Sequence, residues 1–342
     1  MRIVTDRADR FARWAEAEAG IADARIATPL AGGNANVTSL VESASGPLVL
    51  RHPPADTVSD LAGAGIAREY RFIEALHGKA PVAKPVAFCD DIEVLGVPFS
   101  LTGFVEGVAI TDTLPAGWAR DMATLDEAGE ALVDAIAQVH AIDPPEHLGD
   151  RDKARAFVTR QVSRWRKVRG KDRVRDLPAI ETVGQWLIDN APDPEAVRIV
   201  HCDYHLDNVL MAADRPEVRA ILDWEMATLA DPLVDLGLVT AFWNRDEAGP
   251  LGFAFVQRVS NRHGAVSGAA LAERWAGVTG LSIDRLAYYQ VFALWRLAAI
   301  VEGAFVLYRA GQVDGEYERG LERDVPELLA AAEAIARREG MA

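Results

Sequence analysis

The order of apolar and polar positions along the chain predicts two regions of different architecture. The first twenty residues, MRIVTDRADRFARWAEAEAG, place apolar side chains on one face of an amphipathic helix. Short runs rich in β-branched residues follow (ARIATPL, VTSLVES and PLVLRHPP), with the Gly-rich turn AGGNAN between the first two. Apolar runs around such a turn predict a β-hairpin with a third strand beside it.

One helix and two further strands complete the first third of the chain. The segment AGIAREYRFIEALHG has apolar residues at helical spacing, among them Ile66, Tyr70 and Ile73, and the pattern stops at Gly78. Two more apolar runs, AKPVAFCDD and VPFSLTGFVEG, then predict strands. We therefore expect a small sheet that carries one inserted helix.

From about residue 120 the spacing of apolar residues is helical. It is interrupted once, by short apolar runs on either side of the turn AADRPE, and it resumes at about residue 233. These patterns predict an α+β fold with two lobes. Residues 1–107 form a β-rich N-lobe, and residues 108–342 form a mainly helical C-lobe.

The most apolar stretch, residues 286–308, is long enough to cross a bilayer, but it contains Arg296 and Glu302. An arginine at the centre of a membrane helix costs about 2.5–3.5 kcal/mol on insertion scales. We therefore expect a buried helix of the C-lobe. Six residues correspond to about 240° around a helix, so the two charged side chains should not face one pocket together.

Charge and cysteine content narrow the functional classes. A formal charge of −15 disfavours a nucleic acid or an anionic membrane surface as the main partner. The two cysteines, Cys89 and Cys202, are far apart, which argues against a disulfide framework. The N-terminus lacks the apolar core of a signal peptide, so we expect a cytoplasmic protein.

Chemistry-bearing residues are concentrated in HCDYHLDNVL, residues 201–210. One interpretation is a zinc site built from His201, Cys202, Asp203 and His205. It is disfavoured if this stretch is a strand, because neighbouring side chains of a strand alternate faces and Cys202 would then point away from its flanking partners.

A second interpretation is a phosphoryl-transfer loop. His201, Asp203 and Asn208 have the spacing H-x-D-x-x-x-x-N of a kinase catalytic loop. There Asp203 would orient an acceptor hydroxyl and take its proton, while His201 would be structural. Asn208 and Asp223, which follows the next apolar run, would offer oxygen ligands to Mg²⁺.

Residues of the N-lobe can supply the phosphate contacts. Gly32, Gly33 and Asn34 of AGGNAN leave backbone N–H groups open to phosphate oxygens. Arg51 lies on the third predicted strand, where a cation could hold the phosphates. Glu69 lies on the inserted helix, which follows this strand in the chain, so we expect it to pair with Arg51.

With these motifs in order, the chain resembles the aminoglycoside phosphotransferase-like branch of the protein-kinase-like fold. It is most similar to the subgroup also found fused to acyl-CoA dehydrogenases. The resemblance implies ATP, Mg²⁺ and phosphorylation of a small-molecule hydroxyl. It also implies that FVEG is a hinge where backbone groups of Gly103 and Val105 hold adenine, with Leu210 as a further nucleotide contact.

Some positions depart from the family pattern. Cys202 replaces a glycine, Arg51 replaces the commoner lysine, and Asp-Trp-Glu stands where protein kinases have Asp-Phe-Gly. His205 and Arg296 are candidate substrate contacts, since a cation in so apolar a helix predicts an anionic acceptor. Asp231 and Asp235 are predicted to cap a helix that starts near Pro232.

Two alternatives to the plain kinase interpretation stay open. One is a catalytically silent kinase-like protein that binds a nucleotide without turnover. The other is a kinase for an acyl-CoA-linked hydroxy acid.

Overall fold

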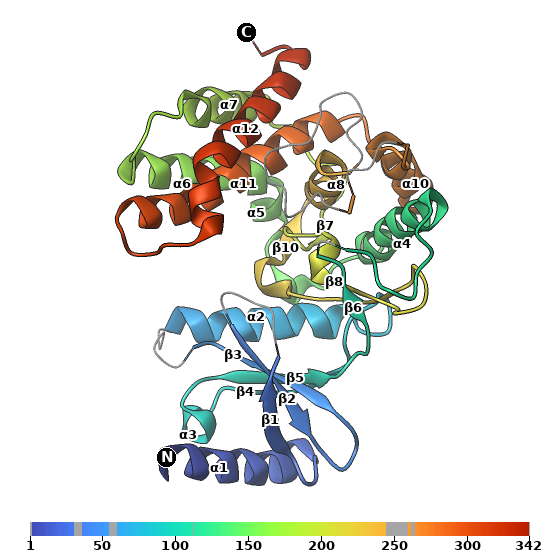
Figure 1. Cartoon of the computed structure of the whole chain (residues 1–342), viewed down its shortest axis with the longest axis vertical. Coiled ribbons are helices and arrows are strands. Elements are labelled where there is room, and N and C mark those ends of the chain that lie inside the picture. Colours follow the sequence, from blue (N-terminus) through green and yellow to red (C-terminus); the bar gives the residue numbers. More distant parts are fainter. Residues whose placement is uncertain are drawn as a thin grey trace. The chain divides into compact units, whose positions relative to one another are not determined.

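The computed structural model describes residues 2–30, 36–54, 60–111, 113–243, 259–260 and 264–341. The chain divides into two compact units (Figure 1). The first comprises Met1–Gly107 together with Arg219–Ala227, and the second comprises Val108–Val218 together with Thr228–Ala342. A sheet dominates the first unit and helices dominate the second, so the predicted α+β class is confirmed.

The first unit is built on a five-stranded antiparallel sheet in the order β1-β2-β3-β5-β4. The predicted hairpin, its third strand and the two later strands are all present. Their bounds are β1 Arg25–Pro29, β2 Val37–Glu42, β3 Leu48–His52, β4 Pro85–Cys89 and β5 Phe99–Gly103.

Helices cover both faces of this sheet (Figure 1). On one face, α1 (Arg2–Ala19) buries Phe11 and Ala15 in a cluster that includes Leu50 and Phe99. On the other face, α2 (Asp60–Leu76) packs against β3, β4 and β5. Side chains alternate along a strand, so the residue after Leu50, Arg51, is directed to the α2 side of the sheet.

The chain leaves α2 as the pattern predicted. His77 N–H donates to the carbonyl of Ile73, and Gly78 follows with a φ of 74°, a left-handed conformation that glycine adopts without steric cost. A short helix, α3 (Ile92–Leu95), was not predicted. Asp91 caps its start by accepting the N–H of Glu93 at 2.9 Å.

The segment 219–227 belongs to the first unit although it follows the HCDYHLDNVL motif in sequence. It includes most of β9 (Val218–Ile221) and the 3₁₀ turn η3 (Trp224–Met226). Ile221 N–H donates to the carbonyl of Pro81 at 2.7 Å, and η3 packs on α2. Asp223 is therefore grouped with the sheet, whereas its position in the chain assigned it to the C-lobe.

The second unit is mainly helical, with α11 at its centre (Figure 1). Two antiparallel strand pairs lie within it, β7 (Arg198–Val200) with β10 (Thr228–Ala230), and β6 (Val108–Ala109) with β8 (Val209–Met211). Its α-helices are α4 Met122–His140, α5 Arg151–Arg155, α6 Phe157–Lys171, α7 Pro178–Asp189, α8 Leu233–Ala241, α10 Gly268–Thr279, α11 Leu286–Arg309 and α12 Glu316–Arg338.

Helix α11 contains the apolar stretch, residues 286–308, for which a membrane span and a buried helix were compared above. It is long and apolar enough to cross a membrane, but 61% of its most apolar window is buried inside the protein. It packs against α6, α7, α8 and α12. Arg296 and Glu302 are both buried and have different partners, since Glu302 pairs with Arg175 while Arg296 donates to the carbonyl of Cys202. The stretch is thus packed as the predicted buried helix.

Candidate active site

The motif loop, residues 201–208, connects β7 to β8 in the second unit. It is not a strand, so the argument that alternation turns Cys202 away from its neighbours is wrong. Cys202 instead has a φ of 68°, a left-handed conformation that a non-glycine residue adopts at a cost of about 1 kcal/mol or more. Glycine adopts this conformation without that cost, so the glycine that the family pattern leads one to expect at this position would fit the observed backbone.

The backbone around Cys202 is held on both sides. Asp235 accepts the N–H of His201 and the N–H of Cys202, each at 2.7 Å. Arg296 Nη1 donates to the carbonyl of Cys202, also at 2.7 Å. All these groups are buried, so the hydrogen bonds fix the start of the loop in its left-handed turn.

The predicted capping role of Asp235 is wrong, whereas Asp231 does cap helix α8. Asp231 accepts the N–H of Leu233 at 2.9 Å. Asp235 lies within the first turn of α8, and its carboxylate points to the motif loop and to His140, whose Nε2 is 3.1 Å away. Trp275 donates to Nδ1 of that imidazole at 3.0 Å, so the His140 proton is on Nε2 and is donated to Asp235.

We expect Asp235→Asn to lower the free energy of unfolding by about 3 kcal/mol, because an amide cannot accept all three buried hydrogen bonds. Turnover should fall as well, since the loop start would lose its support. Denaturant unfolding measures the first effect. Asp207→Asn, at a more exposed position of the same loop, is the matched control, and equal stability of both variants would contradict this role.

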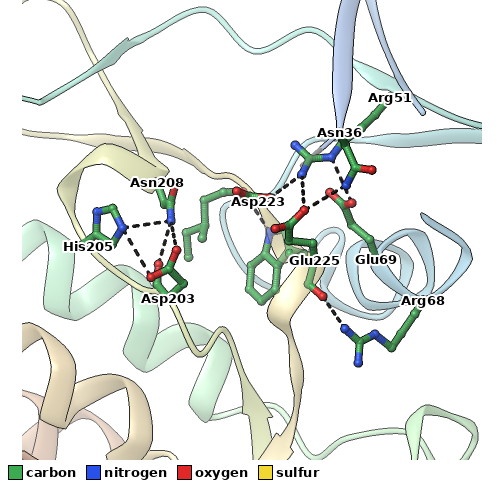
Figure 2. Close-up of polar contacts among 11 residues, drawn as sticks. Asn36, Arg51, Arg68, Glu69, Asp203, His205, Asn208, Asp223 and Glu225 are labelled. Atoms are coloured by element: carbon green, nitrogen blue, oxygen red, sulfur yellow. Dashed lines mark hydrogen bonds and ion pairs between the residues drawn. The ribbon is translucent and has the colours of Figure 1, made fainter. Parts of the chain in front are cut away.

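The interior of the loop places Asp203 beside Asn208 (Figure 2). The side-chain amide of Asn208 donates to the carbonyl of Asp203 at 2.8 Å and to its Oδ2 at 3.1 Å. Within the described residues, Oδ1 of Asn208 accepts no hydrogen bond. The side chain of Asp203 is 41% exposed. The loop thus presents one carboxylate and one amide oxygen to an incoming ligand.

Cations around Asp203 keep it ionised. Burial works to raise the pKa of Asp203, but His205, His201 and Arg296 outweigh it, so the pKa lies below its ordinary value. Burial works to lower the pKa of His205. Asp203 and Asp207, each with an oxygen 3.6 Å from the ring, raise it to about 9. At neutral pH an imidazolium therefore lies between two carboxylates.

The raised pKa of His205 predicts a pH-dependent stability. The folded value, about 9, exceeds the ordinary 6.5, so the stabilisation is complete below about pH 6.5 and is lost as the pH rises through about 9. His205→Gln should therefore cost on the order of 2 kcal/mol at pH 6 and almost nothing above pH 10. Denaturant unfolding of both proteins across this range tests the idea. A difference that does not depend on pH would contradict it.

A second polar cluster lies in the first unit, around Arg51 (Figure 2). Arg51 Nε is 3.1 Å from Glu69 Oε2, and its Nη2 donates to Asp223 and lies 3.3 Å from Glu225. Asn36 donates to Glu225 at 2.9 Å. The predicted pairing of Arg51 with Glu69 is therefore present. Glu225, which contacts both Arg51 and Asn36, was not predicted as a member of this cluster, and neither was Asn36.

The cluster carries more negative charge than positive. Burial raises the pKa of Glu69 to about 7, Asp223 and Glu225 add to the rise, and Arg51 opposes it. Although burial alone would lower the pKa of Arg51, the three carboxylates raise it. Asp223 has a φ of 60°, the left-handed conformation again. One guanidinium among three carboxylates suits the addition of a divalent cation.

The donor set fits Mg²⁺ better than a metal that needs an all-protein cage. Among the described residues, no group of three or more His, Cys, Asp or Glu side chains is arranged to hold a metal ion. Mg²⁺ does not require one, because it keeps several waters and takes one or two protein oxygens together with substrate phosphates. The carboxylate of Asp223 and the Oδ1 of Asn208 are oxygens of the required type.

The remaining predicted nucleotide contacts have mixed outcomes. Gly32, Gly33 and Asn34 lie outside the described residues. Gly103 ends β5, and its N–H donates to the carbonyl of Lys84 at 2.8 Å, so only its carbonyl is left to contact a base. Val105 lies in irregular chain and makes no backbone hydrogen bond within the described residues. Leu210 lies in β8 opposite Ala109.

The candidate substrate contacts both have partners inside the fold. His205 lies between Asp203 and Asp207, and Arg296 donates to Cys202. Burial of Arg296 in an apolar helix therefore does not require an anionic acceptor, because the loop backbone and the nearby Asp203 charge compensate it. Contact of either residue with a substrate stays a prediction.

Comparison with known proteins shows the family and the fold of this chain. The model of the phosphotransferase enzyme family matches residues 26–269. Acyl-CoA dehydrogenase family member 10 of Mus musculus is 28% identical over 283 residues, which cover 82% of this chain and 26% of the mouse protein. The chain thus spans about a quarter of the length of that relative.

Two solved structures have the same fold. A putative aminoglycoside phosphotransferase from Ralstonia eutropha superposes with a TM-score of 0.78 at 24% identity, covering 96% of this chain and 98% of that one. An aminoglycoside phosphotransferase in ternary complex with streptomycin and ATP has a TM-score of 0.58 at 15% identity, covering 94% and 96%. The family match extends over most of the residues and includes both polar clusters, and the chain belongs to the phosphotransferase enzyme family.

Proposed function

We propose that the protein transfers the γ-phosphoryl group of ATP to the hydroxyl of a small molecule in a Mg²⁺-dependent reaction. The observation that carries the proposal is the state of Asp203. It is a partly exposed, ionised carboxylate on a loop whose backbone is locked by Asp235, Arg296 and Asn208. Such a fixed carboxylate can orient a hydroxyl and accept its proton.

The other residues would hold the nucleotide. Arg51, kept in place by Glu69, is suited to bind the α- and β-phosphates, because its planar guanidinium grips two oxygens at once. Val105 and the carbonyl of Gly103 would contact the adenine. Asn208 and Asp223 would hold Mg²⁺. When bound, that ion neutralises the charge that develops on the phosphate oxygens.

ATP as the donor is supported by a neighbour of the same fold. The streptomycin complex contains ATP, and Arg51, Glu69 and Asp223 form the ion-paired cluster that we propose to face the phosphates. In this proposal Arg51 exchanges its contact with Asp223 for a phosphate when ATP binds. The exchange is favourable because the excess carboxylate charge is then shared with the divalent cation.

The identity of the acceptor is proposed only at the level of a hydroxylated small molecule. Solved neighbours bind streptomycin or spectinomycin, but at 15% identity they do not identify the acceptor of this chain. The relative from Mus musculus carries the name of an acyl-CoA dehydrogenase. That name favours, as a second candidate, a hydroxy acid linked to coenzyme A as the acceptor.

A screen of hydroxylated compounds tests the proposal. The protein is incubated with Mg²⁺–ATP and panels of amino sugars, hydroxy acids and hydroxyacyl-CoA thioesters, and ADP release is followed. We expect at least one class to stimulate ADP release well above the rate without acceptor. ATP binding without stimulation by any class would favour the catalytically silent alternative.

A further inference from the structure

A strongly basic segment stands out in this acidic chain. Residues 160–175, which form most of α6 and part of the connection to α7, contain eight Lys or Arg residues and one Asp, while the whole chain has a formal charge of −15. Like charges so close together repel one another. A segment of this kind is stabilised when an anion lies among its cations.

A cavity of about 300 Å³ opens beside this segment in the second unit. It is lined by the end of α6, the α6–α7 connection, the start of α7 and Glu302 of α11. Its ionisable lining consists of three arginines and four carboxylates. Because the number of arginines is close to the number of carboxylates, the ion pairs among them determine which ionisable group of the lining remains without a partner.

Three of the four carboxylates are already paired. Glu302 accepts a hydrogen bond from Nε of Arg175 at 3.1 Å. Nη1 of Arg175 donates to the carbonyl of Glu322 at 2.7 Å. Glu181 accepts from Arg166 at 2.6 and 2.9 Å. Asp176 is paired with Arg173. Arg169 and Asp172 are the ionisable groups of the lining that remain.

Arg169 is buried with incomplete hydrogen bonding, although its guanidinium lies 5.9 Å from the centre of the Trp165 ring. Its side chain is 9% exposed, and its Nη2 is 3.6 Å from Asp172, beyond the length of a hydrogen bond. Its Nε and Nη1 have no hydrogen-bond partner among the described residues. The guanidinium lies over α11 at Gly303, where a β-carbon would stand 3.4 Å from Nη2. A buried guanidinium that lacks acceptors carries a large desolvation cost.

We propose that this cavity binds a small molecule through a phosphate or carboxylate group, and that Arg169 is the residue that receives it. An oxyanion supplies the two acceptors that the guanidinium of Arg169 lacks. Gly303 is seven residues after Arg296, which puts both on one face of α11 and about 10 Å apart. The site is therefore in the unit of the catalytic loop and is separate from the Arg51 cluster.

Calorimetric titration of the full chain with inorganic pyrophosphate and with citrate, at constant ionic strength and without Mg²⁺, tests the proposal. We expect at least one of the two anions to bind the wild type. Arg169→Gln should weaken that binding at least tenfold. Arg164→Gln, a change at an exposed arginine of the same helix, should leave it unchanged. A preference for pyrophosphate or for citrate identifies the phosphate or the carboxylate chemistry.

Two further variants keep the outcome unambiguous. Arg169→Lys keeps the charge and the aliphatic stem, so it is expected to fold even if the glutamine variant does not, and it should still weaken binding several-fold because the fork is lost. Arg51→Gln should leave the Arg169-dependent binding intact, and any loss it causes should be confined to pyrophosphate bound at the Arg51 cluster. The proposal is overturned if neither anion binds at millimolar concentration, or if binding is lost in Arg51→Gln but survives in both Arg169 variants.

Discussion

Asp203→Asn is expected to lower the rate of phosphoryl transfer by about 10²–10⁴-fold, the range for loss of a positioned general base, while the affinity for ATP changes little. The amide keeps the shape of the side chain and still accepts the hydrogen bond from Asn208, so the loop should not move. It cannot take the proton of the acceptor hydroxyl. The groups proposed to hold ATP belong to a different cluster, around Arg51.

The comparison requires two measurements on the same preparation. Initial rates with the best acceptor from the screen give the loss in turnover, and calorimetric titration with Mg²⁺–ATP gives the affinity. Asp207→Asn serves as the control, because it also removes a carboxylate that flanks His205. Turnover of Asp203→Asn within a factor of three of the wild type would show that Asp203 is not the base.

Asp223→Ala is expected to remove the Mg²⁺-dependent part of ATP binding. In the wild type a ligand at 100 times its Kd stabilises the fold by about 2.7 kcal/mol, so the contribution of Mg²⁺ is readable as a shift in Tm. Loss of the carboxylate removes a metal ligand. It also releases Arg51, which is paired with Asp223 in the structure, so binding of ATP without Mg²⁺ should be kept or strengthened.

Thermal unfolding with ATP, with and without Mg²⁺, separates these effects. Asp203→Asn is the matched control, since it should retain the whole Mg²⁺ increment. If Asp223→Ala retained the full increment as well, the assignment of Asp223 as the metal ligand would be wrong. An increment lost in both variants would instead indicate that Asp203 binds the metal together with Asp223.

Local patterns were sufficient to predict the fold and the partner of Arg51. The strands around AGGNAN, the helix that ends at Gly78 and the buried α11 all follow from apolar periodicity and turn chemistry. The Arg51–Glu69 pair could be predicted from the order of elements along the chain. Arg51 lies on β3, Glu69 lies on α2, and α2 is the helix inserted directly after β3, which packs on the sheet. These features depend on residues close in sequence or on the packing of one element against the next.

The supports of the motif loop could not be predicted in this way. Asp235 is 34 residues from His201, and a carboxylate in the first turn of a helix is normally explained as a cap. Arg296 is 94 residues from Cys202, and its burial indicated a missing partner without indicating which one. Both roles depend on how α8 and α11 pack against the loop, which no local pattern encodes.

The left-handed backbone at Cys202 and Asp223 is the other feature that periodicity does not reveal. Glycine would have signalled it at either position, but this chain has side chains at both. A clue did exist for Cys202, because the family pattern that the motif resembles has glycine there, and the strand interpretation led away from it. Two such residues, one in each polar cluster, are consistent with backbone strain held at functional positions.

The most direct test of the central proposal is the fate of the γ-phosphoryl group. The wild type and Asp203→Asn are incubated with Mg²⁺ and ATP that carries a radioactive γ-phosphate, together with the acceptor selected by the screen, and the products are separated. We predict that label appears in the acceptor with the wild type, depends on Mg²⁺ and is almost absent with Asp203→Asn. Label released only as inorganic phosphate, or transferred equally well by the variant, would contradict a hydroxyl kinase centred on Asp203.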